Sequence, residues 1–488
     1  MSAGKLGFDV SAAGAEYEAV RRKAEQAPPK AEETEPGPEF QFTDLGNARR
    51  LVARHGKRFR YLCDRRKWLC WDGRRWAEDD RGEIKRAAKE TVEAIFEESF
   101  AEPDDRRRND LRKFALRSQS AQRLAGMIEL AQSELPMPMR STEFDRDPWS
   151  FNVFNGTLDL KTGTLQKHDP ENFISKLAPV EFKPEATCPT WDAFLARIMA
   201  DSAPLIGFLR RGAGYSLTGD VSEQCYFVNH GGGCNGKSTF LNALRGVCGD
   251  GEYAMHTPIE TLLAKRDAGG PSNDLARLRG ARFVSAVEGD QGQRLAESRV
   301  KQLTGGDPVA ARYLFAEFFE YVPTFKLWLG VNHKPRIRGT DRATWRRIRL
   351  VPFTTTIPEN ERDPRMLEKL LTEASGILNW CVAGAIEWQE KRLAAPDEVK
   401  RATEEYRAEE DTLAPFFEEC CETDADAWTP FRDLYRAYTD WAKRAGEEKP
   451  WSKRAFAAAL DERGFECDRE NKARPRRGIR VMFREPER

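Results

Sequence analysis

The stretch Gly231-Gly-Gly-Cys-Asn-Gly-Lys-Ser-Thr239 decides the fold of the largest part of this chain. It follows the apolar run 224–229 and precedes Phe240-Leu-Asn-Ala-Leu244, so a strand, a loop and a helix are predicted in that order. Four residues match the pattern G-x-x-x-x-G-K-[ST], namely Gly231, Gly236, Lys237 and Ser238. Glycines let backbone N–H groups turn toward a phosphate, and the helix N-terminus adds further donors. This context predicts a phosphate-binding loop and a nucleotide triphosphatase.

The side chains of this loop add chemistry that its backbone lacks. Lys237 can reach the β- and γ-phosphate oxygens as a positive charge, and the Ser238 hydroxyl can ligate Mg²⁺. Cys234 is interpreted as a small loop residue rather than a redox switch. The expected cofactors are therefore ATP and Mg²⁺, with the nucleotide bound by Gly231, Gly232, Gly233, Cys234, Asn235, Gly236, Lys237, Ser238 and Thr239.

Length and composition set limits on the rest of the chain. At 488 residues, about three domains are expected. Lys and Arg number 79, as do Asp and Glu, so net charge does not argue for a nucleic-acid partner and any basic surface must be local. The ten cysteines have no zinc-ribbon spacing, which predicts a reduced, cytoplasmic protein. No apolar run approaches the roughly 18 residues of a membrane span, so no membrane partner is expected.

The N-terminal part divides into a leader and a small domain. Residues 1–40 are polar and proline-rich, which predicts a disordered leader. Residues 41–150 are expected to form a mixed, mainly helical domain that starts with a helix capped by Thr43 or Asp44. Residues 61–76 predict a hairpin, whose tryptophans are interpreted as core residues in preference to a platform for stacking single-stranded DNA. Residues 82–135 read as helical, with 104–110 as a solvated connection.

The remaining chain reads as three further segments. Residues 151–219 predict short strands and then helices that lead into the ATPase. Residues 220–395 form the predicted ATPase domain. After the break at Ala394-Ala-Pro396, residues 396–488 predict three helices and a basic strand pair, the outline of a winged helix.

An ATPase also needs an acid near its metal, a polar group at the γ-phosphate and a cation for the transition state. Glu288 ends the apolar strand 281–287 and is the expected metal-side acid and water-positioning base, with Asp290 as the alternative. Asn332 ends the strand 324–331 and fits the γ-phosphate sensor. Two arginines follow and could act as an arginine finger toward a neighbouring subunit, Arg346 and Arg347.

The order of these motifs resembles that of superfamily 3 helicases, and within them the poxvirus-type ATPase of phage and plasmid primase-helicases. The segments that carry the resemblance are the phosphate loop, Glu288, Lys301-Gln-Leu-Thr-Gly-Gly-Asp-Pro308, Asn332-His-Lys-Pro-Arg336 and Trp345-Arg-Arg-Ile-Arg349. The resemblance implies an α/β fold with an AAA+-like P-loop core, a helical N-terminal region and a homohexameric ring on single-stranded DNA. The C-terminal winged-helix-like domain completes the expected architecture.

DNA contacts are less sharply predicted. The family's DNA-gripping hairpin often has a basic tip, but here the expected tip is Phe315-Ala-Glu-Phe-Phe319. The nearest cations are Lys301, Arg312 and Lys326. In the C-terminal segment, Lys453 and Arg454 open the expected recognition helix, and further cations populate the expected wing: Lys472, Arg474, Arg476 and Arg477.

The leading hypothesis is an ATP-dependent DNA helicase of a phage, plasmid or other mobile element that acts on forked DNA during replication. A combined primase-helicase is the first alternative. Its only motif is the D-x-D match Asp145-Arg-Asp147, which is expected to lie in a linker. The second alternative is an ATP-driven initiator or defence switch that binds DNA without processive unwinding.

Overall fold

The computed structural model describes residues 40–264, 273–287, 293–314, 317–337, 342–446, 450–468 and 475–482. The predicted disordered leader therefore lies almost wholly outside the described residues. The chain separates into two compact units. We call residues 40–56 with 85–135 the helical unit, and residues 57–84 with 136–488 the main unit.

The helical unit contains α2 (Asp44–His55), α3 (Glu83–Ala101), α4 (Asp105–Ser118) and α5 (Ala121–Ala131). Thr43 caps α2 as predicted, because its hydroxyl accepts the N–H of Gly46 at 3.0 Å. The prediction of a solvated connection over 104–110 was wrong. Asp104 is the N-cap of α4 and accepts the N–H of Arg107 at 2.7 Å, so the charged run forms the first turns of a helix.

A small sheet follows α2 but belongs to the main unit, so 41–150 is not a single domain. It consists of β1 (Phe59–Leu62), β2 (Lys67–Trp71), β3 (Trp76–Glu78) and β4 (Pro138–Met139), in the order β3-β2-β1-β4. Trp76 is 1% exposed and binds this sheet to a distant segment: its backbone and indole N–H groups donate to Ile174 and Pro170. The core role predicted for the tryptophans is thus confirmed for Trp76.

The lead-in segment has the predicted order of strands and then helices. Its strands are β5 (Ser150–Val153), β6 (Gly156–Asp159) and β7 (Thr164–Gln166), which form an antiparallel sheet. The helices are α6 (Pro189–Ile198) and α7 (Ala203–Leu217). They are separated where Ala200 and Asp201 adopt left-handed φ values of 49° and 58°.

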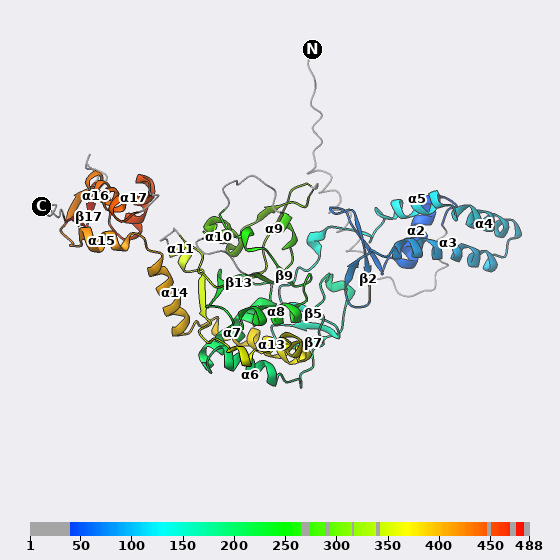
Figure 1. The fold of residues 1–488 in the computed structure, drawn as a ribbon. Coiled ribbons are helices and arrows are strands. Elements are labelled where there is room, and N and C mark those ends of the chain that lie inside the picture. The colour runs from blue at the N-terminus through cyan, green and yellow to red at the C-terminus, as the bar shows by residue number, and fades with distance from the viewer. Residues whose placement is uncertain are drawn as a thin grey trace, which may run out of the picture. The chain divides into compact units, whose positions relative to one another are not determined.

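The centre of the main unit is a five-stranded parallel sheet in the order β14-β8-β13-β10-β9. Its strands are β8 (Tyr226–His230), β9 (Ala254–His256), β10 (Phe283–Val287), β13 (Lys326–Val331) and β14 (Ile348–Pro352). Figure 1 shows α6, α7, α8 (Lys237–Cys248) and α13 (Ala374–Lys391) on one face of this sheet. The other face carries α9 (Asn273–Arg277) and α10 (Glu297–Gly305).

Apolar strand composition explains why this sheet lies in the interior. All six residues of β13 are buried, as parallel strands covered on both faces require. On the α8 face, Trp328 stacks between Phe227, with ring centroids 3.9 Å apart, and Phe283, at 5.8 Å. Because all strands run the same way, the sheet has one amino end, where the strands begin, and one carboxyl end, where they finish.

Several shorter elements complete the central region. A hairpin of β11 (Val309–Ala311) and β12 (Phe319–Tyr321) lies between β10 and β13 in sequence, where the family's hairpin was expected. The remaining helices here are α11 (Arg342–Trp345), α12 (Met366–Thr372) and the 3₁₀ helices 141–143, 170–172, 259–261 and 359–361.

The helix α14 (Asp397–Glu409) packs on the central sheet rather than with the C-terminal segment. Its Tyr406 is 1% exposed in the core on the α10 face, and Val399 is 1% exposed in the core on the α8 face. The predicted boundary at 396 therefore cuts through a packed region. A break after α14 fits the packing better, because its apolar side chains have no other core to join.

The C-terminal segment has its own core. It contains α15 (Ala414–Cys420), β15 (Cys421–Glu422), β16 (Trp428–Pro430), α16 (Phe431–Arg444), α17 (Lys453–Glu462), β17 (Pro475–Arg477) and β18 (Arg480–Val481). Tyr438 and Phe456 stack at 4.6 Å in the centre of this core. The three helices occur in the predicted order, but β17 and β18 do not pair with each other as the predicted hairpin requires: β17 pairs with β16 and β18 with β15. Lys472 and Arg474 lie outside the described residues.

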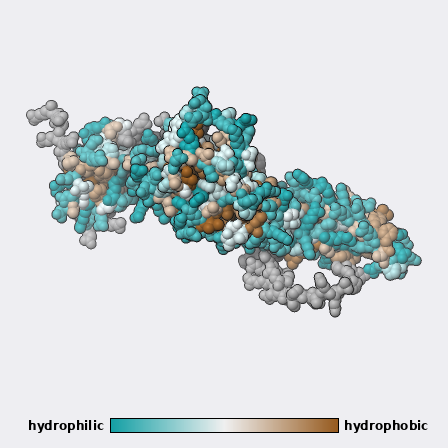
Figure 2. Space-filling view, turned by 90° about the horizontal axis from the view of Figure 1, so that it is seen from below, coloured by the Kyte–Doolittle hydropathy of each residue, from teal (hydrophilic) through white to brown (hydrophobic). Residues whose placement is uncertain are grey.

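No helix among the described residues is long and apolar enough to cross a membrane. Figure 2 shows a mostly hydrophilic face with separate small hydrophobic patches.

Candidate functional site

The stretch 231–236 forms a tight loop between β8 and α8. Gly233 and Gly236 have φ values of 101° and 80°, which side-chain-bearing residues rarely adopt. A Cβ atom on Gly231 would lie 2.2 Å from the carbonyl oxygen of Phe353, and one on Gly236 would lie 2.6 Å from Ile198. The loop can therefore pass this close to its neighbours only with glycine at these positions.

Lys237 begins α8, and its side chain folds back across the loop. It is 5% exposed, and its Nζ donates to the carbonyl oxygen of Gly231 at 2.7 Å. It also donates to the side-chain oxygens of Asn235 at 2.9 Å and Asn332 at 3.0 Å. The amide of Asn235 in turn donates to Phe353 at 3.1 Å, so the acceptor of the ammonium group is itself held in place.

Strand register brings the predicted sensor next to the loop. Val331 pairs with His230, so Asn332 and Gly231 follow directly at the carboxyl end of the sheet. Val287 pairs with Gly330 and lines the same cavity of about 200 Å³ as Ser238 and Asn332. Glu288 and Asp290 follow Val287 in sequence but lie outside the described residues, so their roles remain predictions.

The donor set of this cavity fits a triphosphate. Gly236 occupies the N-cap position of α8 and offers no side-chain acceptor to the first N–H groups of the helix. Burial lowers the pKa of His230, and the ammonium groups of Lys334 and Lys237 lower it further, so this imidazole is neutral near pH 7. Lys237 is the cation among the described residues that line this cavity, and the exposed hydroxyl of Ser238 offers an oxygen of the kind Mg²⁺ prefers.

The two predicted arginines do not join this cavity. They precede β14, whose first residue pairs with Tyr226 at the start of β8. A five-residue strand spans roughly 16 Å, so both lie at the opposite end of the sheet from the loop. Arg346 is exposed and donates to Gln224 at 3.0 Å, whereas the half-buried Arg347 donates to the carbonyl oxygen of Ala343 at 2.6 Å.

One predicted DNA contact is wrong. Lys326 is 1% exposed at the amino end of β13, and its Nζ donates to the carbonyl oxygens of Thr218, Asp220 and Thr324 at 2.5, 2.9 and 3.2 Å. Burial holds the pKa of Lys326 well below its ordinary value. Its side chain therefore belongs to the interior. The sequence offered no warning, because a lysine at the start of an apolar strand normally faces water.

The other predicted DNA contacts lie nearer the surface. Lys301 is half-buried on α10, and the guanidinium of Arg312 lies 4.8 Å from the ring centre of the exposed Phe318. Lys453 lies 5.7 Å from the ring centre of Tyr435, and Arg454 is exposed on α17.

Arg476 differs from its neighbours in the expected wing. It is 4% exposed, forms an ion pair with Asp461 and donates to the carbonyl oxygen of Phe465 at 2.9 Å. The predicted phosphate contact at this position is therefore wrong, because the guanidinium joins the wing to α17. Arg477 is exposed and pairs with Asp468 at 3.1 Å.

The two carboxylates of the D-x-D match hold backbone N–H groups, one distant and one local in sequence. Asp145 accepts the backbone N–H of Ser175 at 2.8 Å, and Asp147 accepts that of Trp149 at 3.1 Å. Among the described residues, no cluster of three or more His, Cys, Asp or Glu side chains could hold a metal ion.

Sequence reasoning missed the contacts that hold the segment after Asn332. Lys334 forms an ion pair with Glu409 at 2.7 Å, and the N–H of Ile337 donates to Glu410 at 2.8 Å. The hydroxyl of Tyr406 donates to the carbonyl oxygen of Pro335. Helix α14 thus fixes the segment that carries the predicted sensor, and no local motif could signal contacts across more than seventy residues.

Comparisons with known proteins find matches to two protein families and to several viral proteins. A family model described as "D5 N terminal like" matches residues 48–200, and one described as "Poxvirus D5 protein-like" matches 408–471. The chain is 29% identical over 304 residues to "Putative helicase 022R" of Frog virus 3, covering 58% of this chain and 30% of that protein.

Two further relatives come from other large DNA viruses. A "Putative helicase" of Acanthamoeba polyphaga mimivirus is 25% identical over 323 residues, covering 61% of this chain and 33% of its own length. A "Putative primase" of African swine fever virus is 24% identical over 339 residues, covering 64% of this chain and 35% of its own. The chain thus spans about a third of these relatives.

Among solved structures, the apo C-terminal region of NrS-1 aligns with a TM-score of 0.48 at 12% identity, covering 77% of each chain. The family assignment rests on the sequence matches instead. The chain carries a D5 N-terminal-like domain and a poxvirus D5 protein-like domain, and it is similar to proteins of large DNA viruses named as helicases and primases, consistent with the superfamily 3 helicase and primase family.

Proposed function

We propose that this protein is an ATP-dependent DNA helicase that moves along single-stranded DNA as a ring during replication of a mobile genetic element. The observation that carries the proposal is the position of Lys237. Its ammonium group lies between the glycine-rich loop and Asn332, in a cavity bordered by the start of α8. A cation and helix N–H groups at one point are suited to a triphosphate.

Each residue of the cavity has a separate role in ATP hydrolysis. Lys237 exchanges its amide acceptors for phosphate oxygens, and Asn332, next to it, senses the terminal phosphate. Ser238 and Glu288 hold Mg²⁺, which when bound neutralises charge on the phosphate oxygens. Glu288 also positions the attacking water.

The strand order supports an AAA+-like P-loop core. The strand before the loop, β8, and the strand before Glu288, β10, lie on either side of β13, which carries the sensor. The carboxyl ends of these three strands lie together, which supports a role for Glu288 beside the loop and Asn332. Arg346 and Arg347 lie at the other end of the sheet, too far away to reach the loop of their own subunit. This supports a role for one of them at the loop of a neighbouring subunit, and hence a ring. The family resemblance leads us to expect six subunits.

The C-terminal segment adds a second DNA contact. Its three helices, with β17 and β18 paired to β16 and β15, support a winged-helix-like domain in which α17 is the recognition helix. The exposed Arg454 and the neighbouring Lys453 are placed at the first turn of that helix.

A duplex-unwinding assay tests the proposal. Forked and single-tailed duplexes of both polarities are incubated with the protein, ATP and Mg²⁺, and Lys237→Ala serves as the matched inactive control. We expect strand separation that needs both hydrolysis and an assembled oligomer. Hydrolysis stimulated by DNA without strand separation on any substrate would reject the helicase and favour the ATP-driven switch.

A combined primase-helicase is the second candidate, favoured by the African swine fever virus relatives named as putative primases. Primer synthesis from nucleotides on a single-stranded template tests it. Asp145 and Asp147 accept the backbone N–H groups of Ser175 and Trp149, and neither belongs to a metal-holding cluster among the described residues, so we expect no primer synthesis.

A further inference from the structure

A second cavity lies at the amino end of the central sheet, opposite the nucleotide loop. Its volume is about 1450 Å³, larger than the roughly 300–1,000 Å³ of small-molecule pockets. One wall is formed by β2, β3 and the turn between them. The other contains Arg282 and Thr324, which precede β10 and β13. All of its lining residues belong to the main unit.

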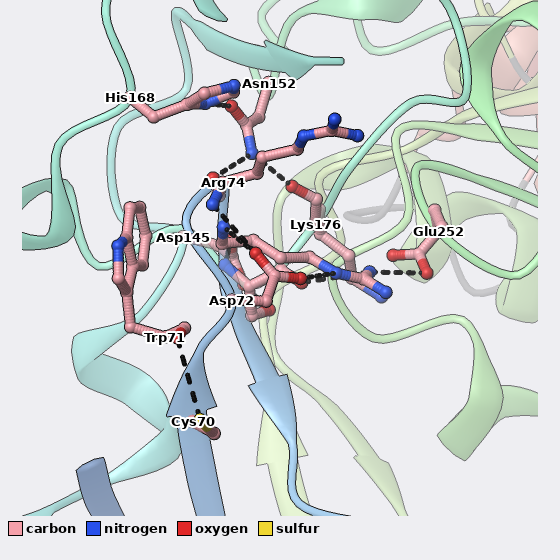
Figure 3. Close-up of polar contacts among 11 residues, drawn as sticks. Cys70, Trp71, Asp72, Arg74, Asp145, Asn152, His168, Lys176 and Glu252 are labelled. Atoms are coloured by element: carbon pink, nitrogen blue, oxygen red, sulfur yellow. Dashed lines mark hydrogen bonds and ion pairs between the residues drawn. The ribbon is translucent and has the colours of Figure 1, made fainter. Parts of the chain in front are cut away.

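Specific polar contacts join the two walls. The side-chain amide of Asn152 donates to the carbonyl oxygens of Arg74 at 2.9 Å and Lys176 at 3.0 Å (Figure 3). One buried amide thus connects the β2–β3 turn to the segment that contains Lys176. Arg75, beside that turn, forms an ion pair with Glu252 at 2.6 Å. The cavity is therefore a fixed feature of the fold.

Most acids of this cavity are already engaged. Three glutamates pair with arginines of the same wall or of the opposite one: Glu83 with Arg58, Glu78 with Arg65, and Glu252 with Arg75. Three aspartates accept backbone N–H groups: Asp72, Asp79 and Asp145. The ion pairs neutralise the three glutamates, whereas the aspartates keep their negative charge and are held in place by the backbone N–H groups.

Six other cations line the cavity, and none forms an ion pair within the part of the chain that the structure describes: Arg81, Arg146, Lys176, Arg277, Arg279 and Arg282. Arg279 donates to the hydroxyl of Ser141 at 2.7 Å. Arg282 is 5% exposed and donates only to carbonyl oxygens, of Leu217 at 2.7 Å and Asp147 at 3.1 Å. Neutral acceptors satisfy their N–H groups but leave their charge in place.

Lys326 lies behind the same wall, but burial and the neighbouring guanidinium of Arg282 lower its pKa, so the charge on this side of the cavity rests on Arg282. A buried guanidinium whose printed hydrogen bonds go to carbonyl oxygens favours an anion in the space before it.

Aromatic rings accompany the cations. Trp71 and Tyr313 are half-buried in the lining, and each is held by a second ring: Trp76 at 5.8 Å and Phe319 at 5.5 Å. Single-stranded nucleic acids bind where cations lie along their sugar-phosphate backbone and aromatic side chains stack on their bases. An acidic polypeptide would use the charge but not the rings.

We infer that this cavity binds a segment of single-stranded nucleic acid, with its phosphodiester groups at Lys176 and Arg277 and its bases against Trp71 and Tyr313. The site adds a strand contact outside the ATPase loop and the C-terminal segment. It rests on the proposed function only in the choice of DNA as the ligand.

Charge reversal in the full-length chain tests the inference. The variant Lys176→Glu/Arg277→Glu alters two side chains that hold no other contact in the described structure, and Lys167→Glu is the control on an exposed loop outside the cavity. Binding of labelled oligothymidylate is measured by anisotropy over a range of salt. We expect weaker binding and a slope of log K against log [salt] lower by about 1.4, since each single-strand phosphate contact contributes about 0.7. Lys167→Glu should leave the slope unchanged.

Two further measurements separate this inference from the proposed function. ATP binding and DNA-independent hydrolysis should stay at the wild-type level in the double variant, because the loop lies at the other end of the sheet. Oligonucleotides with bromouracil should crosslink to peptides containing Trp71 or Tyr313. An unchanged salt slope in the double variant, together with crosslinks at other peptides, would overturn the inference. So would a result in which polyglutamate binding depends on Lys176 and Arg277 but oligothymidylate binding does not depend on them.

Discussion

Two buried lysines lie at opposite ends of the same parallel sheet and differ in what surrounds them. Lys237, at the carboxyl end, is 5% exposed, and two of its three acceptors are side-chain amides beside a cavity. Lys326, at the amino end, is 1% exposed, and its three acceptors are backbone carbonyl groups. Side-chain acceptors can rotate away and give up the ammonium group to a ligand, whereas backbone carbonyls are fixed by the fold.

This difference separates the lysine proposed to bind a ligand, Lys237, from a structural one, Lys326. Burial alone says little, because both side chains are almost fully enclosed. The decisive property is whether the acceptors can be exchanged for a ligand without breaking the chain's packing. The two ends of the sheet should therefore respond differently to substitution, and the following experiments rank those responses.

The largest effect is expected for the arginines near the amino end. If one of them completes the loop of a neighbouring subunit, Arg346→Ala or Arg347→Ala lowers turnover by roughly 10³–10⁵, while nucleotide binding changes little. Whichever of the two arginine variants is less active is then mixed with Lys237→Ala protein. Part of the activity should return, because some subunit interfaces then contain both an intact arginine and an intact Lys237. If mixed oligomers form but regain no activity, neither arginine acts on the loop of a neighbouring subunit. The two ends of the sheet would then not meet across a subunit interface.

Lys237→Ala comes next. Removing the only buried cation described beside the loop should weaken ATP binding and lower hydrolysis by at least about 10²–10³-fold, measured by equilibrium binding and phosphate release. Glu288→Gln keeps this cation, so nucleotide should still bind while turnover is lost. Equal loss of binding in both variants would contradict the separate roles.

Lys326→Met should act on stability instead. Loss of the ammonium group leaves three carbonyl oxygens without their donor, and a cost of about 1–3 kcal/mol in the free energy of unfolding is expected. ATP binding per folded molecule should not change. Urea unfolding followed by nucleotide titration of the remaining folded protein checks both. A loss of ATP binding without a loss of stability would place Lys326 in the site.

The same variant has a defined pH dependence. Burial holds the pKa of Lys326 well below its ordinary 10.5 in the folded chain. Between the folded pKa and 10.5, the unfolded chain carries a proton on Lys326 that the folded chain lacks, so proton uptake favours unfolding. This destabilisation decreases as the pH rises through that range. The stability of the wild type relative to Lys326→Met should therefore increase with pH across this window. A difference that stays constant would mean that Lys326 is solvated.

The smallest effect on the ATPase is expected from removing the C-terminal segment. A chain that ends after Glu410 keeps α14, and with it the contacts of Lys334 and Pro335, so basal hydrolysis should persist. Its DNA affinity and salt dependence should fall, because Lys453 and Arg454 are lost. A chain that ends at 396 loses Tyr406 as well, and thermal unfolding should show the added destabilisation.

Much of the candidate nucleotide site was predictable because the loop is one continuous segment and Asn332 directly follows an apolar strand. The strand, glycine turn and helix around Lys237 form one continuous segment, and Asn332 ends a strand whose neighbours are apolar. The charged run at 104–110 was misread because Asp104 caps α4, while the assignment of α14 failed because Tyr406 packs on residues far away in the chain.

The sequence by itself determined the chemistry at the loop, since glycines with positive φ, a lysine and a helix start act through the local backbone. Only the tertiary structure decided which cations are available to a ligand. Lys326 is enclosed by carbonyl groups from residues 218 and 220, while Lys176 and Arg277 meet in one cavity although a hundred residues separate them. Burial and charge pairing are set by segments distant in sequence, and no local pattern records them.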